Sequence, residues 1–170
     1  MSRMIGAEIR YARMGYWVRE APIGYMSEKI ETPNGKRCIL KPHPIEAQWI
    51  IKMFELRCRG NLDDRQIVKE VNTLGFRTRI DYVRDSKDRT KIVREHGGNQ
   101  LNIKGLWRYI QNPIYAGINT EKWNNGVAVK CNFPGLVSIE TFNQANKGKN
   151  FISEENGEVK IYKKAPPEYL

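Results

Sequence analysis

Residues 43–75 read HPIEAQWIIKMFELRCRGNLDDRQIVKEVNTLG, and they carry the clearest helical pattern in the chain. Pro44 suits the first turn of a helix, where its missing N–H is not needed, and His43 occupies the preceding cap position. Gly60 predicts the end of this helix. The apolar residues that recur along one face of it are Ala47, Ile50, Ile51, Phe54 and Cys58.

A second helix is predicted directly after the first. Asp63, followed three residues later by Gln66, predicts a capping box, and Gly75 ends the run. The side chains expected on its buried face are Ile67, Val68, Val71 and Leu74. Two amphipathic helices joined by a short polar link predict a helical hairpin.

A third helix is predicted from the capping residue Asn102 to the residue before Pro113, since proline disfavours helix in the residue that precedes it. The side chains expected on its buried face are Ile103, Leu106, Trp107 and Ile110. The candidate DNA-contacting residues of its outer face are Asn102, Lys104, Gly105, Arg108 and Gln111. Such a helix fits the major groove, and a glycine there allows close approach to a DNA backbone or base. An ordinary amphipathic helix with a solvated basic face is the alternative.

The rest of the chain predicts short strands and turns around these helices. Residues 1–14 read as a helix, and the turn Pro33-Asn34-Gly35 before a short strand predicts a hairpin. Strands are expected at residues 114–118 and 127–129, with a turn at 124–126 between them, and Ser138 caps a last short helix. The predicted class is α+β: a helical hairpin and a third helix around one core, edged by short β-hairpins.

The chain has 170 residues, and its 29 Lys and Arg against 19 Asp and Glu give a formal net charge of +10. This length suits one ordinary domain, and the charge predicts an anionic partner. The apolar runs are far too short to span a membrane, and the arginine-rich start lacks the apolar block of a secretory signal. We therefore expect a cytoplasmic protein that has no membrane partner.

Two further basic segments are candidate DNA contacts. Arg10, Arg13 and Arg19 flank Gly15 and are typical of an extended arm that enters a minor groove. Residues 77–100 predict an exposed loop or loose hairpin. The candidate contacts in it are Arg77, Arg79, Lys87, Arg89 and Lys91. A solvated charged surface explains this segment equally well.

Patterns typical of catalytic sites are missing from the sequence. It has no nucleotide-phosphate loop, no HExxH and no GxSxG motif. Cys38, Cys58 and Cys131 form no CxxC pair, and His43 and His96 are interpreted as polar surface residues. We therefore expect no catalytic residue, no bound metal and no cofactor in this chain.

Several short segments together form a family pattern. Gly15-Tyr16-Trp17-Val18 precedes Ala21-Pro22-Ile23-Gly24-Tyr25, Pro44-Ile45-Glu46-Ala47 opens the first helix, and Asn112-Pro113-Ile114-Tyr115-Ala116-Gly117 follows the third. In this order, over residues 10–148, they resemble the DNA-binding recombinase domain of the large serine recombinases, which include serine integrases and conjugative-transposon recombinases. The residues that carry the structural motif are Gly15, Tyr16, Trp17, Pro22, Gly24, Tyr25, Asn112, Pro113, Tyr115 and Gly117.

The resemblance implies a fragment of a phage or mobile-element enzyme from a bacterial cytoplasm. Residues 1–14 resemble the tail of a helix from an upstream catalytic domain that carries the serine nucleophile, residues 15–148 the recombinase domain, and residues 149–170 a linker toward a zinc ribbon. It implies binding to a double-stranded attachment half-site and a parent protein that is a dimer or tetramer on DNA. The fragment itself would place the catalytic domain and break no bond.

The chain also departs from the family pattern. Arg19-Glu20 stands where glycines are usual, His43 replaces an acidic cap, and Leu101 replaces a tryptophan. Residues 79–100 are long for the family, which leaves their path on DNA open. The rival hypotheses are a stand-alone helix-turn-helix transcription regulator, a small nuclease that uses His43 or His96 with a carboxylate, and an RNA-binding module. The sequence argues against an RNA-binding module because it lacks the aromatic-rich strands on which such modules stack bases.

Overall fold

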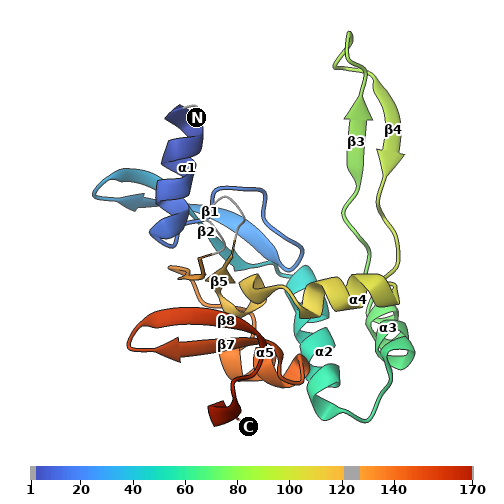
Figure 1. Ribbon diagram of the computed structural model, residues 1–170. Coiled ribbons are helices and arrows are strands. Elements are labelled where there is room, and N and C mark those ends of the chain that lie inside the picture. The colour runs from blue at the N-terminus through green and yellow to red at the C-terminus, as the bar shows by residue number, and fades with distance from the viewer. Residues whose placement is uncertain (1–2, 121–126, 170) are drawn as a thin grey trace.

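Three helices form the scaffold of the computed structural model, which describes residues 3–120 and 127–169. Helix α2 (Glu46–Arg59) and helix α3 (Asp64–Thr73) form the predicted helical hairpin, and α4 (Ile103–Ile110) lies across them (Figure 1). Helix α5 (Ile139–Ala145) packs on the other side of α2, and α1 (Arg3–Arg13) stands apart at the N-terminal end. The α+β class predicted from the sequence is confirmed.

The strands of the described residues form separate two-stranded antiparallel sheets. Strand β1 (Tyr25–Thr32) pairs with β2 (Gly35–Pro42), and β3 (Asp81–Arg84) pairs with β4 (Ile92–His96). The short strands β5 (Ile118–Asn119) and β6 (Val129–Lys130) pair next, followed by β7 (Lys149–Glu155) with β8 (Glu158–Lys164). The 3-10 helix η1 (Pro113–Ala116) follows α4, and η3 (Pro167–Tyr169) follows β8.

The capping box predicted for the second helix is confirmed, whereas α2 begins at Glu46, two residues after the predicted first helical residue Pro44. The Nδ1 atom of His43 accepts hydrogen bonds from the backbone N–H groups of Ile45 and Glu46, at 3.1 and 3.0 Å. Asp63 and Gln66 form the reciprocal capping box, each side chain accepting from the backbone N–H of the other. These contacts satisfy N–H groups that have no partner within the helix.

The apolar faces of the two helices are shifted from the predicted ones. Ile51 and Leu74 are 40% and 52% exposed, whereas Met53 and Leu56 are buried. Leu74 lies just beyond the last residue of α3, and Met53 and Leu56 are buried because α2 packs against α5 as well as against α3 and α4. A helix packed on two sides buries a wider face than a single stripe predicts.

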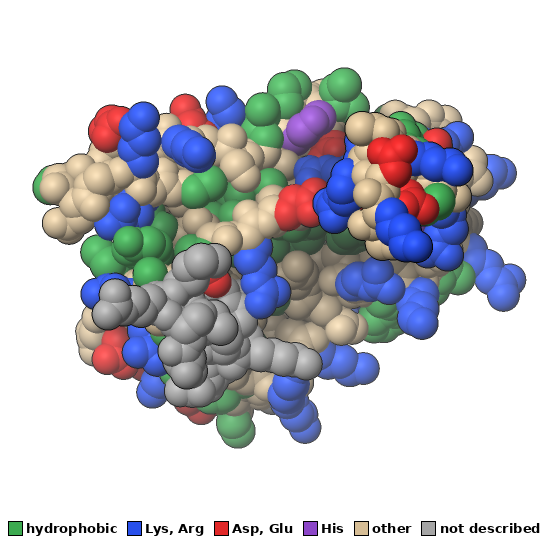
Figure 2. All heavy atoms as spheres, turned by 90° about the horizontal axis from the view of Figure 1, so that it is seen from above, with side chains coloured by type: hydrophobic (Ala, Val, Ile, Leu, Met, Phe, Trp, Pro, Cys, Tyr) green, Lys and Arg blue, Asp and Glu red, His purple; other side chains and the backbone are tan. Residues whose placement is uncertain are grey.

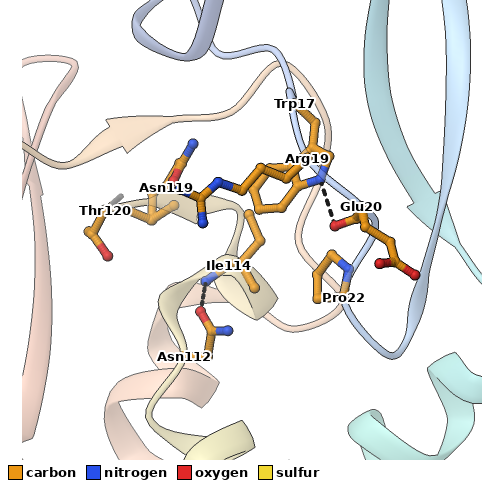
Figure 3. Close-up of a pocket in the computed structure, with 9 residues that line it drawn as sticks. Trp17, Arg19, Glu20, Pro22, Asn112, Ile114, Asn119 and Thr120 are labelled. Carbon is orange, nitrogen blue, oxygen red and sulfur yellow. Dashed lines mark hydrogen bonds between the residues drawn. The ribbon is translucent and has the colours of Figure 1, made fainter. Parts of the chain in front are cut away.

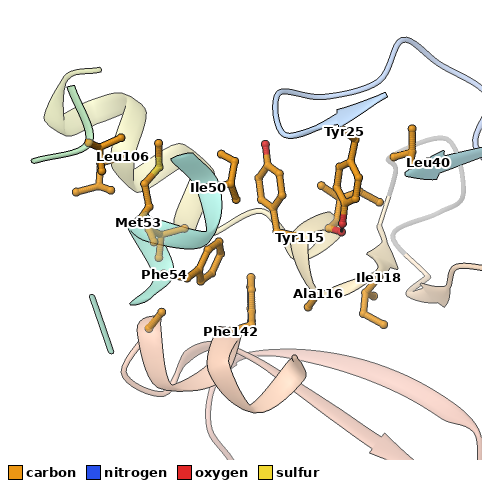
Figure 4. Packing of buried hydrophobic residues seen from close by; sticks show 14 of the residues in the cluster. Tyr25, Leu40, Ile50, Met53, Phe54, Leu106, Tyr115, Ala116, Ile118 and Phe142 are labelled. Atoms are coloured by element: carbon orange, nitrogen blue, oxygen red, sulfur yellow. Dashed lines mark hydrogen bonds between the residues drawn. The ribbon is translucent and has the colours of Figure 1, made fainter. Parts of the chain in front are cut away.

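The core centres on two tyrosines (Figure 4). Tyr25 and Tyr115 stack with ring centroids 5.8 Å apart, and the rings of Phe54 and Tyr109 meet Tyr115 edge-on. Each tyrosine hydroxyl finds a backbone partner: Tyr115 donates to Ile23 O at 2.7 Å, and Tyr25 donates to Ile114 O at 2.9 Å. The two hydroxyls thus join distant segments of the chain, and neither is left buried without a hydrogen-bond partner.

Two sequence predictions about the C-terminal half are wrong. Residues 114–118, predicted as a strand, instead form η1 and the first residue of β5, because Asn112 caps a 3-10 turn by accepting from Ile114 N–H. The predicted linker at 149–170 contains the β7–β8 hairpin, whose Ile152 is 1% exposed and packs into the core. The predicted turn at 124–126 lies outside the described residues.

Candidate nucleic-acid interface

Helix α4 presents a basic face to solvent. Asn102 caps it by accepting from Gly105 N–H at 2.7 Å, and Leu106 and Ile110 are buried beneath it. Lys104 and Arg108, four residues apart, are exposed on the side opposite this buried pair. The predicted pairing of a buried apolar face with an outward basic face is therefore present, although the apolar face is narrower than expected.

Ile103 and Trp107 correct the predicted buried face, since they are 39% and 38% exposed. Trp107 lies at the flank of α4, where its Nε1 donates to the Asp64 carboxylate at 3.0 Å and the Arg57 guanidinium lies 4.7 Å from the centre of its ring. Arg57 also forms an ion pair with Asp64. Gln111 is exposed and lines, together with Arg57, Asp64 and Trp107, a hollow of about 410 Å³.

A side chain of α3 that is not among the predicted DNA contacts holds the start of α4 in place. The Asn72 amide forms two hydrogen bonds with the backbone of Leu101: its Oδ1 accepts from the N–H at 2.8 Å and its Nδ2 donates to the carbonyl at 3.0 Å. Gly105 is half-buried, and a Cβ there would lie 3.2 Å from Leu101 Cδ1. A methyl group at this position would therefore be in tight contact with the Leu101 side chain.

Arg79 was predicted to contact DNA, and the structure instead uses its guanidinium inside the protein. It forms an ion pair with Glu46, whose Oε2 accepts from Arg79 Nε at 3.0 Å, and Nη2 donates to Tyr25 O at 2.9 Å. Further bonds reach the carbonyls of Ala21 and Pro22. A guanidinium with this many partners is a structural cross-link between the β3 base, α2 and the segment before β1.

The Glu46 carboxylate is buried, and its pKa is nevertheless lowered. Burial raises the pKa, but hydrogen bonds from Arg79 and from the Gly24 N–H, together with the positive charge of Arg79, outweigh that effect. A carboxyl whose pKa is lower in the folded state stabilises the fold above its unfolded value and loses this contribution as pH falls.

We expect wild-type protein to lose more free energy of unfolding than Glu46→Gln as the pH drops from the ordinary glutamate value of 4.5 toward the lower folded pKa. The measurement is urea unfolding at a series of pH values, with Glu55→Gln as the control because that carboxylate lies on the exposed face of α2. The expectation would be contradicted if the free energy of unfolding changed with pH in the same way for wild type and Glu46→Gln.

The three arginines near the N-terminus do not form an extended arm. Arg10 and Arg13 lie in the last turn of α1, and the chain extends only after Gly15. Trp17 is buried, and its Nε1 donates to Glu20 O at 3.2 Å, so the following segment packs on the body. Arg19 is exposed at the rim of a hollow of about 350 Å³ that also meets Asn112 and Thr120 (Figure 3).

The remaining motif residues lie around the core and its turns, where Trp17, Tyr25 and Tyr115 are buried and Tyr16 is half-buried. Gly24 has φ +99°, and a Cβ there would lie 2.9 Å from Ile50 Cγ1. These positions are explained by packing and backbone conformation. The motif residues placed in this way are Gly15, Tyr16, Trp17, Pro22, Gly24, Tyr25, Asn112, Pro113, Tyr115 and Gly117.

The hairpin β3–β4 carries the remaining candidate contacts. Lys87, Arg89 and Lys91 are exposed around its tip, and Arg77 is exposed just before its base. In Figure 1 the hairpin and α1 both project from the same side of the body, with α4 at the foot of the hairpin. Figure 2 views this side from above, and Lys and Arg side chains gather around the hairpin and along the edge below it.

The described residues offer little chemistry beyond this basic surface. Among residues 3–120 and 127–169, no group of three or more His, Cys, Asp or Glu side chains is arranged to hold a metal ion. Burial raises the pKa of the Cys58 thiol, and it raises that of Cys131 to about 12, which makes both poor nucleophiles at neutral pH. No helix in the described part is long and apolar enough to cross a membrane.

Comparisons with known proteins were made at the level of sequence and of structure. No family model matches this chain, and the search of curated proteins found no significant match. A solved structure described as "Sequence Requirements of the Listeria innocua prophage attP site" is similar, with a TM-score of 0.56 at 16% sequence identity. The match covers 95% of this chain and 71% of that chain. Likeness at this identity shows that the two chains share a fold over nearly all of this protein.

Proposed function

We propose that this chain binds double-stranded DNA at a recombination attachment site, with α4 in the major groove. The observation that carries the proposal is the exposed pair Lys104 and Arg108 on a short helix whose other face is buried and whose start is fixed by Asn72. A helix held in this way presents its side chains at a defined angle, as base reading requires.

Two further observations support an attachment-site role. The formal charge of +10 suits a polyanionic partner, and the similar solved structure concerns a prophage attachment site. The resemblance of the motif segments to large serine recombinases agrees with both. In this proposal the parent protein is a serine recombinase with its catalytic serine upstream, and this chain positions that domain on DNA without breaking a bond.

The test begins with selection of a preferred sequence from a randomised duplex library. Lys104→Ala or Arg108→Ala should then weaken binding to the selected duplex by about 5- to 150-fold, equivalent to about 1–3 kcal/mol, and weaken binding to a random duplex less. Fluorescence anisotropy measures both affinities. The control is Lys163→Ala with Lys164→Ala, which removes two charges from exposed positions of β8, on the other side of the body in Figure 1.

Equal losses on the selected and random duplexes would contradict base reading by α4 and reduce these residues to phosphate contacts. A failure of wild-type protein to select any sequence would contradict site-specific binding. The reading frame upstream separates the recombinase from the rival transcription regulator, because only a recombinase has a resolvase-like domain there. Cleavage of plasmid DNA by the purified chain with Mg²⁺ would instead support the nuclease hypothesis.

A further inference from the structure

The hairpin β3–β4 projects from the body although its strands have no cover. Every residue of both strands is exposed, and the large apolar side chains Tyr82, Val83 and Ile92 are between 39% and 50% exposed. A two-stranded hairpin alone is marginally stable in water. A long uncovered hairpin therefore needs an anchor at its base.

The base of the hairpin is tightly built. Thr78 N–H donates to Asn99 O at 2.9 Å, Gly98 N–H donates to Thr78 O at 2.9 Å, and Asn99 N–H donates to the Thr78 hydroxyl at 2.9 Å. Gly97 has φ +108°, and a side chain there would overlap the Arg79 carbonyl. Arg79 in turn is bound to Glu46 and to backbone carbonyls of the body. The direction in which the hairpin leaves the body is thereby set.

The two acidic side chains at the tip of the hairpin are hydrogen-bonded within the turn. The Asp85 carboxylate is turned into the loop, where it accepts from the N–H groups of Lys87 and Asp88 at 2.8 and 2.9 Å. Asp88 accepts from the N–H and hydroxyl of Thr90 at 3.1 and 2.6 Å. The acidic groups thus close the turn, while the exposed cations Lys87, Arg89 and Lys91 remain around it. A tip of this kind fits phosphate groups.

The stem does not offer a continuous apolar face to another protein. Val83 lies opposite Arg94, Tyr82 opposite Glu95, and Ile92 opposite Arg84 in the β3–β4 register. Each of these three apolar side chains therefore has a charged neighbour across the ladder, whereas Val93, 54% exposed, lies unpaired at the bulge beside Arg94. Charge complementarity at the tip favours a nucleic acid over a protein as the partner of this hairpin.

The reach of the hairpin places its tip away from α4. At about 3.3 Å per residue, an extended chain from Arg79 to Lys87 would span at most about 26 Å, which is about twice the roughly 12 Å width of the major groove. Residues 97–102 join β4 to α4, so the base of the hairpin lies beside the helix that the proposed function puts in the groove.

We propose that β3–β4 is a fixed arm whose tip residues Lys87, Arg89 and Lys91 contact DNA phosphates outside the groove segment that α4 reads. Arg79 is the positioning residue that anchors the arm and makes no contact with DNA itself. This inference rests on the proposed function, since it assumes that α4 lies on a duplex. It adds a second contact region, which lengthens the bound site.

The experiment compares wild-type protein with a triple tip variant, Lys87→Ala, Arg89→Ala and Lys91→Ala. The control variant is Lys160→Ala, Lys163→Ala and Lys164→Ala, which removes the same charge from exposed positions of β8. On the selected duplex we expect the tip variant to bind about ten-fold or more weakly and its salt dependence to flatten by about 3 in the slope of log K against log salt concentration. The control should match wild type in both measurements.

Phosphate-ethylation interference on the same duplex locates the contacts. We expect wild-type binding to need a group of phosphates that the tip variant no longer needs, separate from those affected by Lys104→Ala and Arg108→Ala. Overlapping sets of phosphates, or a tip variant that binds as wild type does, would overturn the arm while the α4 variants still report on the proposed function. Loss of self-association in sedimentation, with DNA binding unchanged, would also overturn it by showing an interface between copies.

Discussion

Replacing Arg79 with alanine is expected to lower the free energy of unfolding by about 3 kcal/mol or more. The substitution leaves the Glu46 carboxylate, whose side chain is 10% exposed, without its ion-pair partner. It also removes the guanidinium donors from the carbonyls of Ala21, Pro22 and Tyr25. A buried charge and buried acceptors left without partners account for an effect of this size. Chemical denaturation monitored by tryptophan fluorescence measures it.

The control for Arg79→Ala is Arg77→Ala, two residues earlier in the chain. The Arg77 side chain is exposed, and its recorded hydrogen bond goes to the carbonyl of the adjacent residue, Phe76. We expect that substitution to change stability by no more than about 0.5 kcal/mol. Arg79→Lys should fall between the two, because an ammonium cannot reproduce the planar set of donors. Equal losses at positions 77 and 79 would contradict the structural role assigned to Arg79.

Tyr115→Ala is expected to destabilise the fold by about 3–5 kcal/mol. Tyr115 is 1% exposed, contacts the rings of Tyr25, Phe54 and Tyr109, and donates its hydroxyl hydrogen bond to Ile23 O. Alanine leaves a cavity where the segments around η1, β1 and α2 meet. Thermal and urea unfolding measure the loss.

Two further variants separate the loss of the buried ring from the loss of its hydroxyl hydrogen bond. Tyr115→Phe keeps the ring and leaves the Ile23 carbonyl without its donor, so we expect a smaller loss of about 1–3 kcal/mol. Tyr82→Ala removes a tyrosine that is 50% exposed on β3 and should change stability little. A Tyr115→Ala variant as stable as Tyr82→Ala would show that η1 is not part of the core.

The candidate site was predicted in part. The residues that lie where the sequence predicts and those that do not differ in what determines their position. Lys104 and Arg108 are exposed as expected because a helical period alone places them opposite Leu106 and Ile110. Helical spacing also predicts that Trp107 is buried, but its hydrogen bond to Asp64 at the flank of the helix holds it at the surface. The contact between Asn72 and Leu101 could not be predicted from a local pattern, since its two hydrogen bonds join residues 29 positions apart in the chain.

The sequence by itself determined the local features of this protein. The His43 and Asp63 helix starts, the Asn102 cap and the positive charge all depend on neighbouring residues or on composition. Only the tertiary structure decided that Arg79 binds Glu46 across 33 positions and that the segment after Gly148 folds back as a hairpin. An arginine has the same charge whether its partner is a phosphate or a buried carboxylate. Which of the two it meets depends on long-range packing, which no local pattern records.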